Sequence, residues 1–371
     1  MAQGVLMLWL FTIPAVFYAS ILLYISGYLK KIAPFTAAGA SDLPSVSVVI
    51  ACRNEEKNIP GLLNALAAQN YPRHLFEVII VDDNSSDATP VLAGEFKGIL
   101  NLKVIRNSGR GKKAALSCGV GSASFPLVVT TDADCRMSPA WLSAIAGFFR
   151  EEKPEMIICP VNLAAPPRLT GAFQQIEWAA LQGITAGTAV AGNPVMCNGA
   201  GLAFTRDAYM RHSGNMQSHL ASGDDVFFLH SLKRENKGKI LWLPSQEAAV
   251  TTPAASSLRS LVGQRARWVS KSGGYRDPFT IMLAIVTFVT NMSLPFLFAA
   301  AVPGNAFSFL PLAAAFAVKT SADFYFLKQS FSSLRLPEPV NFAGLFFLSE
   351  ILYPIYIIIV LLKSIGRSGK W

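Results

Sequence analysis

The feature that most constrains this chain is an apolar run at residues 5–28 that contains no charged side chain. At about 1.5 Å per residue, a helix of this length measures roughly 36 Å, enough to cross the hydrocarbon core of a bilayer. Further apolar runs occupy 279–302 and 340–362, with a weaker one at 306–327. The chain as a whole is 52% hydrophobic and only 15% charged. The sequence therefore predicts a membrane protein that carries a more polar central domain.

Basic residues beside these runs predict how they are oriented. The first run is too long for the apolar part of a signal peptide, and Lys30 and Lys31 follow it rather than precede it. The positive-inside rule then places the segment after the first run in the cytoplasm. More basic residues precede the second run and agree with this: Arg259, Arg265, Arg267, Lys271 and Arg276.

We therefore predict an N-terminal transmembrane helix at 1–29, a cytoplasmic domain at 30–278 and a C-terminal membrane region of two to three helices at 279–371. The expected location is a bacterial inner (plasma) membrane. The number of C-terminal spans stays open because Lys319 and Asp323 interrupt one run and Glu350 lies in the last. With four spans, the basic tail (Lys363, Arg367, Lys370) would lie outside the cell, so either one run is re-entrant or the tail breaks the rule.

The net charge of +9 raises the question of nucleic acid. We predict no nucleic-acid partner, because the basic residues are not interleaved with stacking aromatic residues and many adjoin a membrane run, where lipid headgroups attract them. Five cysteines lack pair spacing and four histidines show no zinc pattern, so free thiols and no structural metal are expected.

Within the central domain, short β-branched runs alternate with helical patterns. The expected strands are 45–52, 76–83, 102–107 and 126–134. The expected helices lie near 57–69, 86–96 and 112–121, and a fourth begins at Ser138 as its N-cap, ahead of Pro139. Such apolar strands are buried on both faces, which predicts an α/β domain with a mainly parallel sheet and helices on both faces.

Polar residues gather where these strands end, the edge at which ligands bind in parallel sheets. They are Arg53, Asn54 and Glu55, then Asp82 and Asp83, then Asp132 and Asp134. In an extended segment Asp132 and Asp134 point to the same side, and two converging carboxylates are costly without a cation between them. The alternative is a loop in which both aspartates make turn hydrogen bonds.

Three further motifs carry charge. "SGRGKKAAL" (108–116) places Lys112 and Lys113 ahead of a helix, as an anion cradle or an ordinary basic turn. "ASGDDVFFLH" (221–230) begins a helix with two acids, of which capping explains one. "QRARW" (264–268) puts Gln264, Arg267 and Trp268 on one helix face, where Arg and Trp also suit a membrane interface.

Taken in order, "VDDNSSD" (81–87), "DAD" (132–134), the acid pair at 224–225 and Q-x-x-R-W at 264–268 resemble one family. It is the membrane-embedded inverting family 2 glycosyltransferases, the group of cellulose, chitin and hyaluronan synthases and their lipid-glycosylating relatives. The resemblance covers about residues 45–275 and the flanking runs, and implies a GT-A-type, Rossmann-like fold. The third motif departs from the family, because "GDD" stands where Thr-Glu-Asp or Glu-Asp is common.

The resemblance also implies roles for individual residues. Asp132 and Asp134 would hold Mg²⁺ or Mn²⁺, and the residues expected to bind a nucleotide diphosphate sugar are Arg53, Glu55, Asp82, Asp83, Lys112, Lys113 and Asp132. The expected catalytic residues are Asp225 as the general base, Asp224 at the helix start, Arg267 toward the leaving phosphate, Gln264 and Trp268. A lipid or glycan acceptor would approach Asn198, Gly199, Gly201 and Trp268.

These roles describe a membrane-anchored transferase that uses a UDP-sugar in preference to a GDP-sugar. Two alternatives stay open. One is a processive polysaccharide synthase, favoured by Q-x-x-R-W but weakened by the few spans. The other is a non-catalytic membrane scaffold with a degenerate transferase domain, which would require a missing acid. The sequence leaves the sugar, the acceptor and the oligomeric state open.

Overall fold

The structure is a computed structural model that describes residues 8–37, 42–212, 224–235, 239–304 and 306–365. The chain divides into two compact units. One, here called the sheet unit, contains Ile32–Ala164 and Gly192–Ala254; the other, the helical unit, contains Met1–Lys31, Ala165–Ala191 and Ala255–Arg367. Each unit is described by itself.

The sheet unit is built on a sheet that has seven strands among the described residues, in the order β3-β2-β1-β4-β8-β6-β9. These strands are β1 (Val46–Cys52), β2 (Phe76–Asp82), β3 (Leu102–Arg106), β4 (Leu127–Thr130), β6 (Met156–Ile158), β8 (Leu202–Thr205) and β9 (Ile240–Trp242). Neighbouring strands are parallel except where β8 pairs with β4 and β6. A second sheet of the described part joins β5 (Arg136–Met137), β10 (Val250–Pro253) and β7 (Val161–Ala164).

The predicted mainly parallel sheet is therefore confirmed. Its central strands are buried on both faces, as the β-branched runs imply: every residue of β2 and β4 is buried, whereas the edge strand β3 is partly exposed. The register pairs Val46 with Phe76 and continues to Cys52 with Asp82, so β1 and β2 end at the same level.

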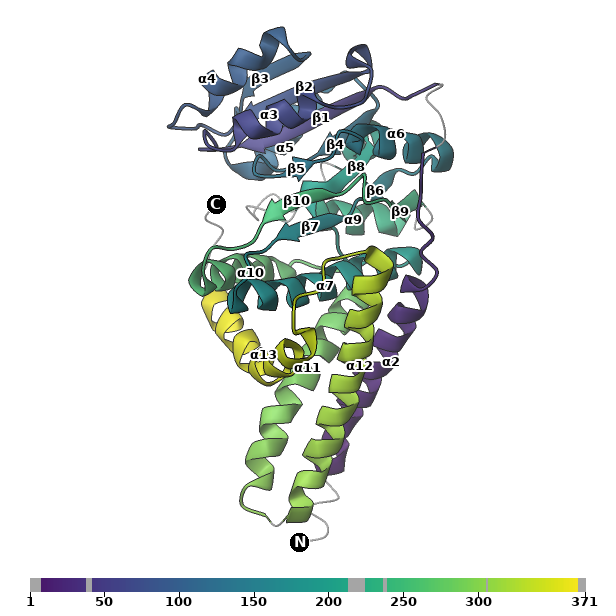
Figure 1. Cartoon of the computed structure of the whole chain (residues 1–371), viewed down its shortest axis with the longest axis vertical. Helices are drawn as coiled ribbons and strands as arrows, with labels where there is room; N and C mark the ends of the chain where they lie inside the picture. The colour runs from purple at the N-terminus through teal and green to yellow at the C-terminus, as the bar shows by residue number, and fades with distance from the viewer. Residues whose placement is uncertain (1–7, 38–41, 213–223, 236–238, 305, 366–371) are drawn as a thin grey trace. The chain divides into compact units, whose positions relative to one another are not determined.

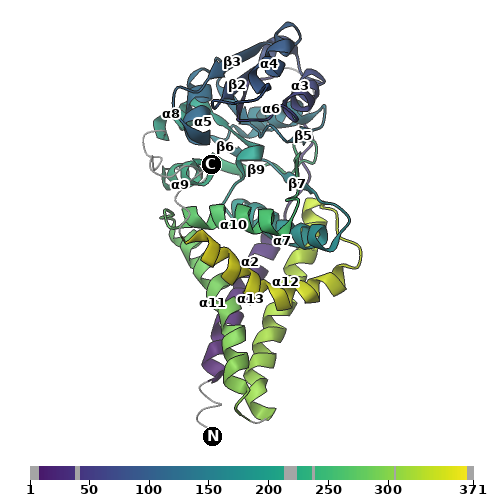
Figure 2. The same cartoon turned by 90° about the vertical axis from the view of Figure 1, so that its left-hand side faces the viewer.

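Helices cover both faces of this sheet, with α5 (Gly111–Gly121) on one side and α3 (Ile59–Ala67) on the other (Figure 2). The α5 helix packs closely because Gly119 faces the sheet, where a Cβ atom would lie 2.4 Å from Cγ1 of Val49. The remaining helices of this unit are α4 (Thr89–Gly94), α6 (Trp141–Glu152), α8 (Arg206–His212) and α9 (Asp224–Glu235).

The prediction that Ser138 caps a helix is wrong. The α6 helix begins at Trp141 and has Ala140 as its N-cap. The Ser138 hydroxyl instead donates to the carbonyl of Glu247 at 2.9 Å, and its own carbonyl accepts from the N–H of Trp141 at 3.2 Å. Residues 138–141 therefore form a turn that precedes the helix.

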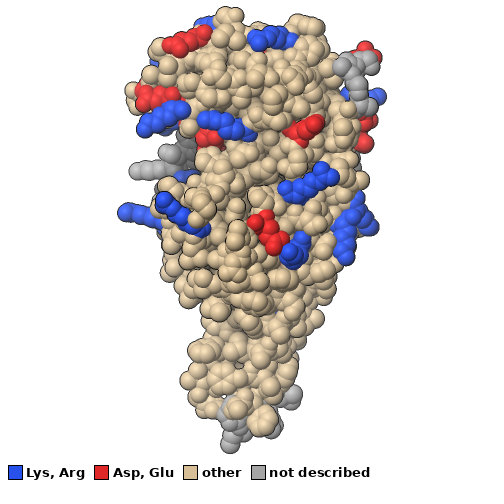
Figure 3. Space-filling model, in the orientation of Figure 1, with Lys and Arg blue, Asp and Glu red and all other residues tan. Residues whose placement is uncertain are grey.

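The helical unit combines long apolar helices with two helices that lie across them (Figure 1). Its members are α2 (Ile13–Leu29), α7 (Leu169–Val190), α10 (Leu258–Ser272), α11 (Pro278–Ala301), α12 (Leu310–Leu334) and α13 (Phe342–Ser364). Among the described residues, three segments are long and apolar enough to cross a membrane: Trp9–Leu29, Pro278–Ala301 and Phe342–Ser364. On the face shown in Figure 3, the surface of α2, α11 and the first half of α12 carries no Lys, Arg, Asp or Glu.

The charges that interrupt the 306–327 run are paired inside the helical unit. Lys319 Nζ donates to Asp323 Oδ2 at 2.8 Å and to Glu350 Oε2 at 2.6 Å. The hydroxyl of Tyr18 donates to Asp323 Oδ1 at 2.7 Å. Helices α2, α12 and α13 therefore share one buried polar cluster, which removes the objection that α12 is too charged to lie among apolar helices.

The α13 helix stays beside α7 and α10 along its length. Near its start, Phe342 belongs to the same apolar cluster as Ile176 of α7. Further along, the hydroxyl of Tyr356 donates to Glu177 of α7 at 3.0 Å. At its end, Lys363 Nζ donates to the carbonyl of Arg259 on α10 at 3.3 Å. The start of α13 therefore lies near α7 and its end lies near α10.

Candidate active site

The candidate site lies at one edge of the main sheet. The carboxyl ends of the parallel strands β1, β2, β3 and β4 meet at this edge. Strand β8 runs in the opposite direction, so its amino end and the preceding segment Asn198–Gly201 reach the same edge. The structure therefore brings together the polar residues that the sequence places after four separate strands.

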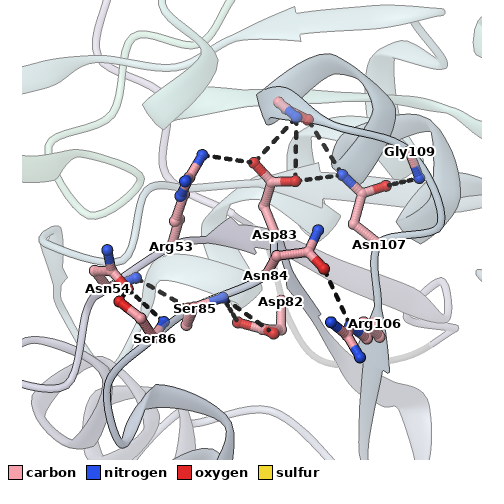
Figure 4. Close-up of polar contacts among 11 residues, drawn as sticks. Arg53, Asn54, Asp82, Asp83, Asn84, Ser85, Ser86, Arg106, Asn107 and Gly109 are labelled. Carbon is pink, nitrogen blue, oxygen red and sulfur yellow. Dashed lines mark hydrogen bonds and ion pairs between the residues drawn. The ribbon is translucent and has the colours of Figure 1, made fainter.

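The turn after β2 uses its two aspartates differently (Figure 4). Asp83 is only 1% exposed and its carboxylate accepts from Asn107 Nδ2 at 2.6 Å and from the N–H of Gly111 at 3.0 and 3.1 Å. Gly111 is the first residue of α5, so this carboxylate occupies the positive end of that helix. Arg53 lies farther away, with Nη1 4.0 Å from Asp83 Oδ2.

Asp82 is less fully engaged than Asp83. Its two carboxylate oxygens lie 3.2 and 3.4 Å from the N–H of Ser85, which donates to them. Of the two aspartates, Asp82 thus retains more acceptor capacity for a ligand, whereas Asp83 holds the start of the helix that carries Lys112 and Lys113.

The loop after β1 is bound to the loop after β2. Asn54 Oδ1 accepts from the N–H of Ser86 at 2.8 Å (Figure 4). The N–H of Glu55 donates to Thr89 Oγ1 at 2.7 Å. The Glu55 carboxylate accepts from Asn58 at 2.7 Å. Partial burial, and then the charges of nearby Asp134 and Asp132, raise the pKa of Glu55 despite that hydrogen bond. Glu55 is therefore electrostatically linked to the D-x-D pair.

The D-x-D pair lies in a turn and not in an extended segment, so the strand-based reason for its convergence is wrong. Strand β4 ends at Thr130, and the N–H of Cys135 donates to the carbonyl of Asp132 at 3.1 Å. The two carboxylates nevertheless influence each other. Burial first, and then the charge of Asp132, raise the pKa of Asp134. The turn therefore places the two carboxylates close enough for their charges to interact, as the extended strand was expected to do.

Lys112 supplies a positive charge in this group. Its Nζ pairs with Asp132 Oδ1. Burial disfavours the ammonium ion, but the charge and hydrogen bond of Asp132, with a contribution from Asp225, raise the pKa of Lys112. Lys113 follows it in the first turn of α5.

Among the described residues, no group of three or more His, Cys, Asp or Glu side chains could hold a metal ion. The two carboxylates of Asp132 and Asp134 are hard oxygen donors that suit Mg²⁺ or Mn²⁺, provided that phosphate and water oxygens complete the shell. The donor set therefore fits a divalent cation that arrives with a diphosphate.

Asp225 lies beside the glycine-containing segment. Its Oδ2 accepts from the N–H of Gly199 at 2.9 Å and its Oδ1 accepts from the N–H of Val226 at 2.9 Å. A Cβ on Gly199 would lie 3.4 Å from that Oδ2, and one on Gly201 would lie 2.8 Å from Cγ2 of Val161. A glycine is therefore required at 201 for the backbone to approach β7, whereas a Cβ at 199 would make only a close contact with the carboxylate.

The remaining predicted residues of this region are placed as follows. The Asn198 side chain accepts from the N–H of Ala200 at 3.0 Å, so it holds its own turn. Asp224 begins α9, and its side chain lies outside the described residues, as does Gly223 of the "GDD" motif.

The Q-x-x-R-W motif lies on α10 in the helical unit, whereas the sheet-edge residues belong to the sheet unit. Arg265, counted from the sequence only as a flanking basic residue, is a further candidate functional residue. Its Nη1 donates to Gln264 Oε1 at 2.7 Å, and its guanidinium lies 4.2 Å from the ring centroid of Trp268. The sequence feature that could have indicated a role for Arg265 is Glu177, an acidic residue in the otherwise uncharged stretch 169–190.

Comparison with known proteins shows a likeness to one family. The family model described as Glycosyl transferase family 2 matches residues 47–212, which run from β1 to the end of α8. The matched region contains the D-x-D turn, Lys112 and the segment Asn198–Gly201, and the prediction of a glycosyltransferase enzyme is supported.

Curated relatives resemble part of the chain. Glycosyltransferase AglE of Haloferax volcanii is 38% identical over 104 residues, which is 28% of this chain and 34% of that protein. Beta-monoglucosyldiacylglycerol synthase of Trichormus variabilis is 37% identical over 115 residues, which is 30% of this chain and 25% of that protein. The match thus spans about a third or less of the length of these relatives.

A solved structure resembles nearly the whole chain. Mannosyltransferase PcManGT from Pyrobaculum calidifontis, in complex with GDP-Man and Mn²⁺, gives a TM-score of 0.58 at 20% sequence identity. The match covers 97% of this chain and 99% of that one. The chain thus has the predicted GT-A-type fold.

Proposed function

We propose that this protein is a membrane-anchored inverting glycosyltransferase. It moves a sugar from a nucleotide diphosphate sugar to a lipid-linked or glycan acceptor by a single displacement. The observation that carries the proposal is the convergence, at one edge of the sheet, of the D-x-D turn, Lys112 and Asp225. A cation site, an ammonium group and a potential base are the groups that such a displacement needs.

The donor diphosphate is proposed to bind at the D-x-D turn. Asp132 and Asp134 would hold a divalent cation, which when bound neutralises charge on the leaving diphosphate. Lys112 would pair with a phosphate oxygen, because it already lies beside Asp132. The nucleoside would lie toward Asp82 and Glu55, next to the bound loops of Figure 4. The mannosyltransferase structure that resembles this chain contains GDP-Man and Mn²⁺, which supports a nucleotide diphosphate sugar as the donor. We propose a UDP-sugar in preference to a GDP-sugar, and a donor panel that contains both tests this choice.

Asp225 is proposed as the general base. The N–H of Gly199 fixes one oxygen of its carboxylate, so the group has a defined orientation at the sheet edge. It would take the proton from an acceptor hydroxyl as that oxygen bonds to the anomeric carbon. The bond from that carbon to the diphosphate oxygen breaks in the same step, and the electron pair leaves on the diphosphate. Positioned proton transfer of this kind contributes about 10²–10⁴ in rate.

We further propose that α2, α11 and α12 cross the membrane and that α13 does not, so that both ends of this continuous helix lie on one side. Its contacts with α7 near its start and with α10 at its end support this arrangement. The N-terminal side of α11 and the basic tail then lie on the same side as Lys30, as the positive-inside rule requires. The cytoplasm is that side, because it holds the expected nucleotide-sugar donor.

The acceptor is proposed to be a membrane lipid. The Q-x-x-R-W motif belongs to the helical unit, together with the proposed membrane helices. In this proposal Arg267 faces the leaving phosphate and Trp268 offers a ring face to the acceptor. We favour single transfer over processive synthesis because three crossing helices are few for a chain-conducting pore.

The test measures nucleotide release by the purified full chain from a panel of UDP- and GDP-sugars, with and without Mn²⁺, in the presence of membrane lipid acceptors. We expect one donor to be cleaved with transfer to lipid, and Asp225→Asn to lower kcat at least about 10²-fold with unchanged donor affinity. Asp207→Asn is the control, because its carboxylate is 80% exposed on α8 of the same unit. Transfer by Asp225→Asn at the control rate would refute the base assignment, and release from no donor would refute the function.

A further inference from the structure

Arg265 is a charged residue placed in the interior of the helical unit. It stands inside the Q-x-x-R-W motif, directly after Gln264, and is only 6% exposed. Its partner Glu177 on α7 is 8% exposed. Removing both charges from water is costly, so the contacts that the pair makes decide what it can contribute.

The guanidinium of Arg265 makes contacts along two of its edges and on one face. Its Nε lies 3.1 Å from both carboxylate oxygens of Glu177, and its Nη2 donates to Oε2 at 2.8 Å. Its Nη1 points the other way and donates to Gln264 Oε1 at 2.7 Å. Its face lies over the indole of Trp268, with 4.2 Å from the guanidinium carbon to the ring centroid. One planar group therefore fixes two of the three motif residues.

Glu177 connects this group to α13. Its Oε1 accepts from the hydroxyl of Tyr356 at 3.0 Å as well as from Arg265. The Tyr356 ring in turn packs against Phe173 of α7, with 5.2 Å between centroids. Glu177 thus links Tyr356 of α13 to Arg265 of the Q-x-x-R-W motif.

We propose that Arg265 is the positioning residue of the Q-x-x-R-W motif, held by Glu177 and Tyr356, and that it sets the orientation of Gln264 and Trp268 for the acceptor. This inference rests on the proposed function and deepens it. Arg is required because its planar fork can serve a carboxylate and an amide while its face stacks on an indole. A lysine keeps the charge but offers one donor centre and no planar face.

A purely structural ion pair would behave differently from a positioning group. If the pair only joined α7, α10 and α13, its loss would lower the folded fraction and every activity in proportion. If Arg265 positions Gln264 and Trp268, its loss lowers use of the acceptor while donor binding, which the sheet-edge residues perform, stays unchanged. The separation of acceptor and donor parameters therefore distinguishes the two roles.

The experiment compares Arg265→Lys, Glu177→Gln, Glu177→Asp and Tyr356→Phe in the full chain in detergent. Glu338→Gln is the matched control, since Glu338 forms an exposed ion pair with Lys328 in the same unit. For each variant we would measure the thermal midpoint, donor affinity by calorimetry, and kcat and KM against lipid acceptor. The donor is the one that the wild-type protein cleaves.

Arg265→Lys should lower kcat/KM for the acceptor at least about tenfold while the donor Kd changes less than about twofold, since small errors of orientation are costly in transfer reactions. Tyr356→Phe deletes a single hydroxyl and should lower the same parameter by about three- to tenfold. Glu177→Asp should retain more activity than Glu177→Gln, because it keeps the carboxylate.

Three results would overturn the inference. They are acceptor kinetics of Arg265→Lys and Tyr356→Phe equal to those of Glu338→Gln, parallel losses of donor affinity and transfer, and activity that follows the folded fraction alone. Absence of transfer by the wild-type protein with every donor would overturn the proposed function and this inference with it. Wild-type transfer that Arg265→Lys fully retains would overturn the inference and leave the proposed function standing.

Discussion

Replacing Asp83 with asparagine tests whether this residue holds the fold or the nucleotide. The Asp83 carboxylate is 1% exposed and accepts from Asn107 at 2.6 Å and from the first N–H of α5 at 3.0 Å. An asparagine oxygen in the place of Oδ1 can keep the bond from Asn107 and the 3.1 Å bond from the N–H of Gly111. Its amide nitrogen then replaces the acceptor that lies 3.0 Å from that N–H, so two buried donors face each other and the helix loses a negative charge at its positive end.

The size of the effect follows from these two losses. A hydrogen bond to a charged group contributes about 1.5–3 kcal/mol, and a carboxylate at a helix N-terminus about 0.3–1 kcal/mol. Asp83→Asn should therefore destabilise the sheet unit by about 2–4 kcal/mol, or about 5–15 °C in thermal midpoint for a unit of this size. Asp82→Asn loses only the longer bonds to Ser85, so we expect at most about 1.5 kcal/mol.

Differential scanning fluorimetry of the two variants in detergent measures the midpoints, and calorimetry with UDP and GDP measures nucleotide affinity. Since α5 carries Lys112, Asp83→Asn should weaken nucleotide binding in parallel with its loss of stability. An Asp83→Asn midpoint within about 2 °C of wild type, or a larger loss in Asp82→Asn, would show that the capping role is wrong.

Two further predictions concern pH and metal. Burial favours the neutral form of Glu77, but its bonds from Lys103 at 2.8 Å and Ser47 at 2.7 Å, with others, lower its pKa. A lowered pKa stabilises the fold above the ordinary glutamate pKa, and this contribution is lost as pH falls through the lowered value. Glu77→Gln should therefore lower the thermal midpoint at pH 7 and have little effect near pH 3, and an equal loss at both would contradict this. Asp134→Asn should abolish the increase in UDP affinity that Mn²⁺ causes, as EDTA should for the wild-type protein. A Mn²⁺ effect that Asp134→Asn retains in calorimetry would show that the D-x-D turn has a purely structural role.

The α/β architecture could be predicted because its signal is local. The expected 45–52 and 76–83 strands correspond to β1 and β2 within a residue or two, since a strand buried on both faces must be apolar throughout. Because the predicted strands are parallel, the candidate residues that follow them could also be predicted to lie at one edge of the sheet. The end of β4 was less predictable, because a turn and an extended strand both suit "TTDAD".

Side-chain partners from distant parts of the chain could not be predicted. From the sequence, Asp83 is a candidate ligand-binding residue. In the structure, its carboxylate already accepts hydrogen bonds from Asn107 and Gly111, which come 24 and 28 residues later. Arg265 and Glu177 are 88 residues apart, and nothing local to either residue shows that they meet. Hydropathy likewise identifies α12 and α13 as separate apolar runs and does not show that they interact. In the structure, Lys319 of α12 donates a buried hydrogen bond to Glu350 of α13.

The cluster of Lys319, Asp323, Glu350 and Tyr18 has a consequence for how the protein is made. During synthesis α12 emerges with an ammonium group and a carboxylate among apolar residues, and only its own i,i+4 pair offsets them. The acceptor from Glu350 comes from a helix that is synthesised later, and the donor from Tyr18 from one synthesised earlier. In the proposed topology, stable insertion of α12 would depend on α13, because Glu350 supplies the second carboxylate that Lys319 contacts.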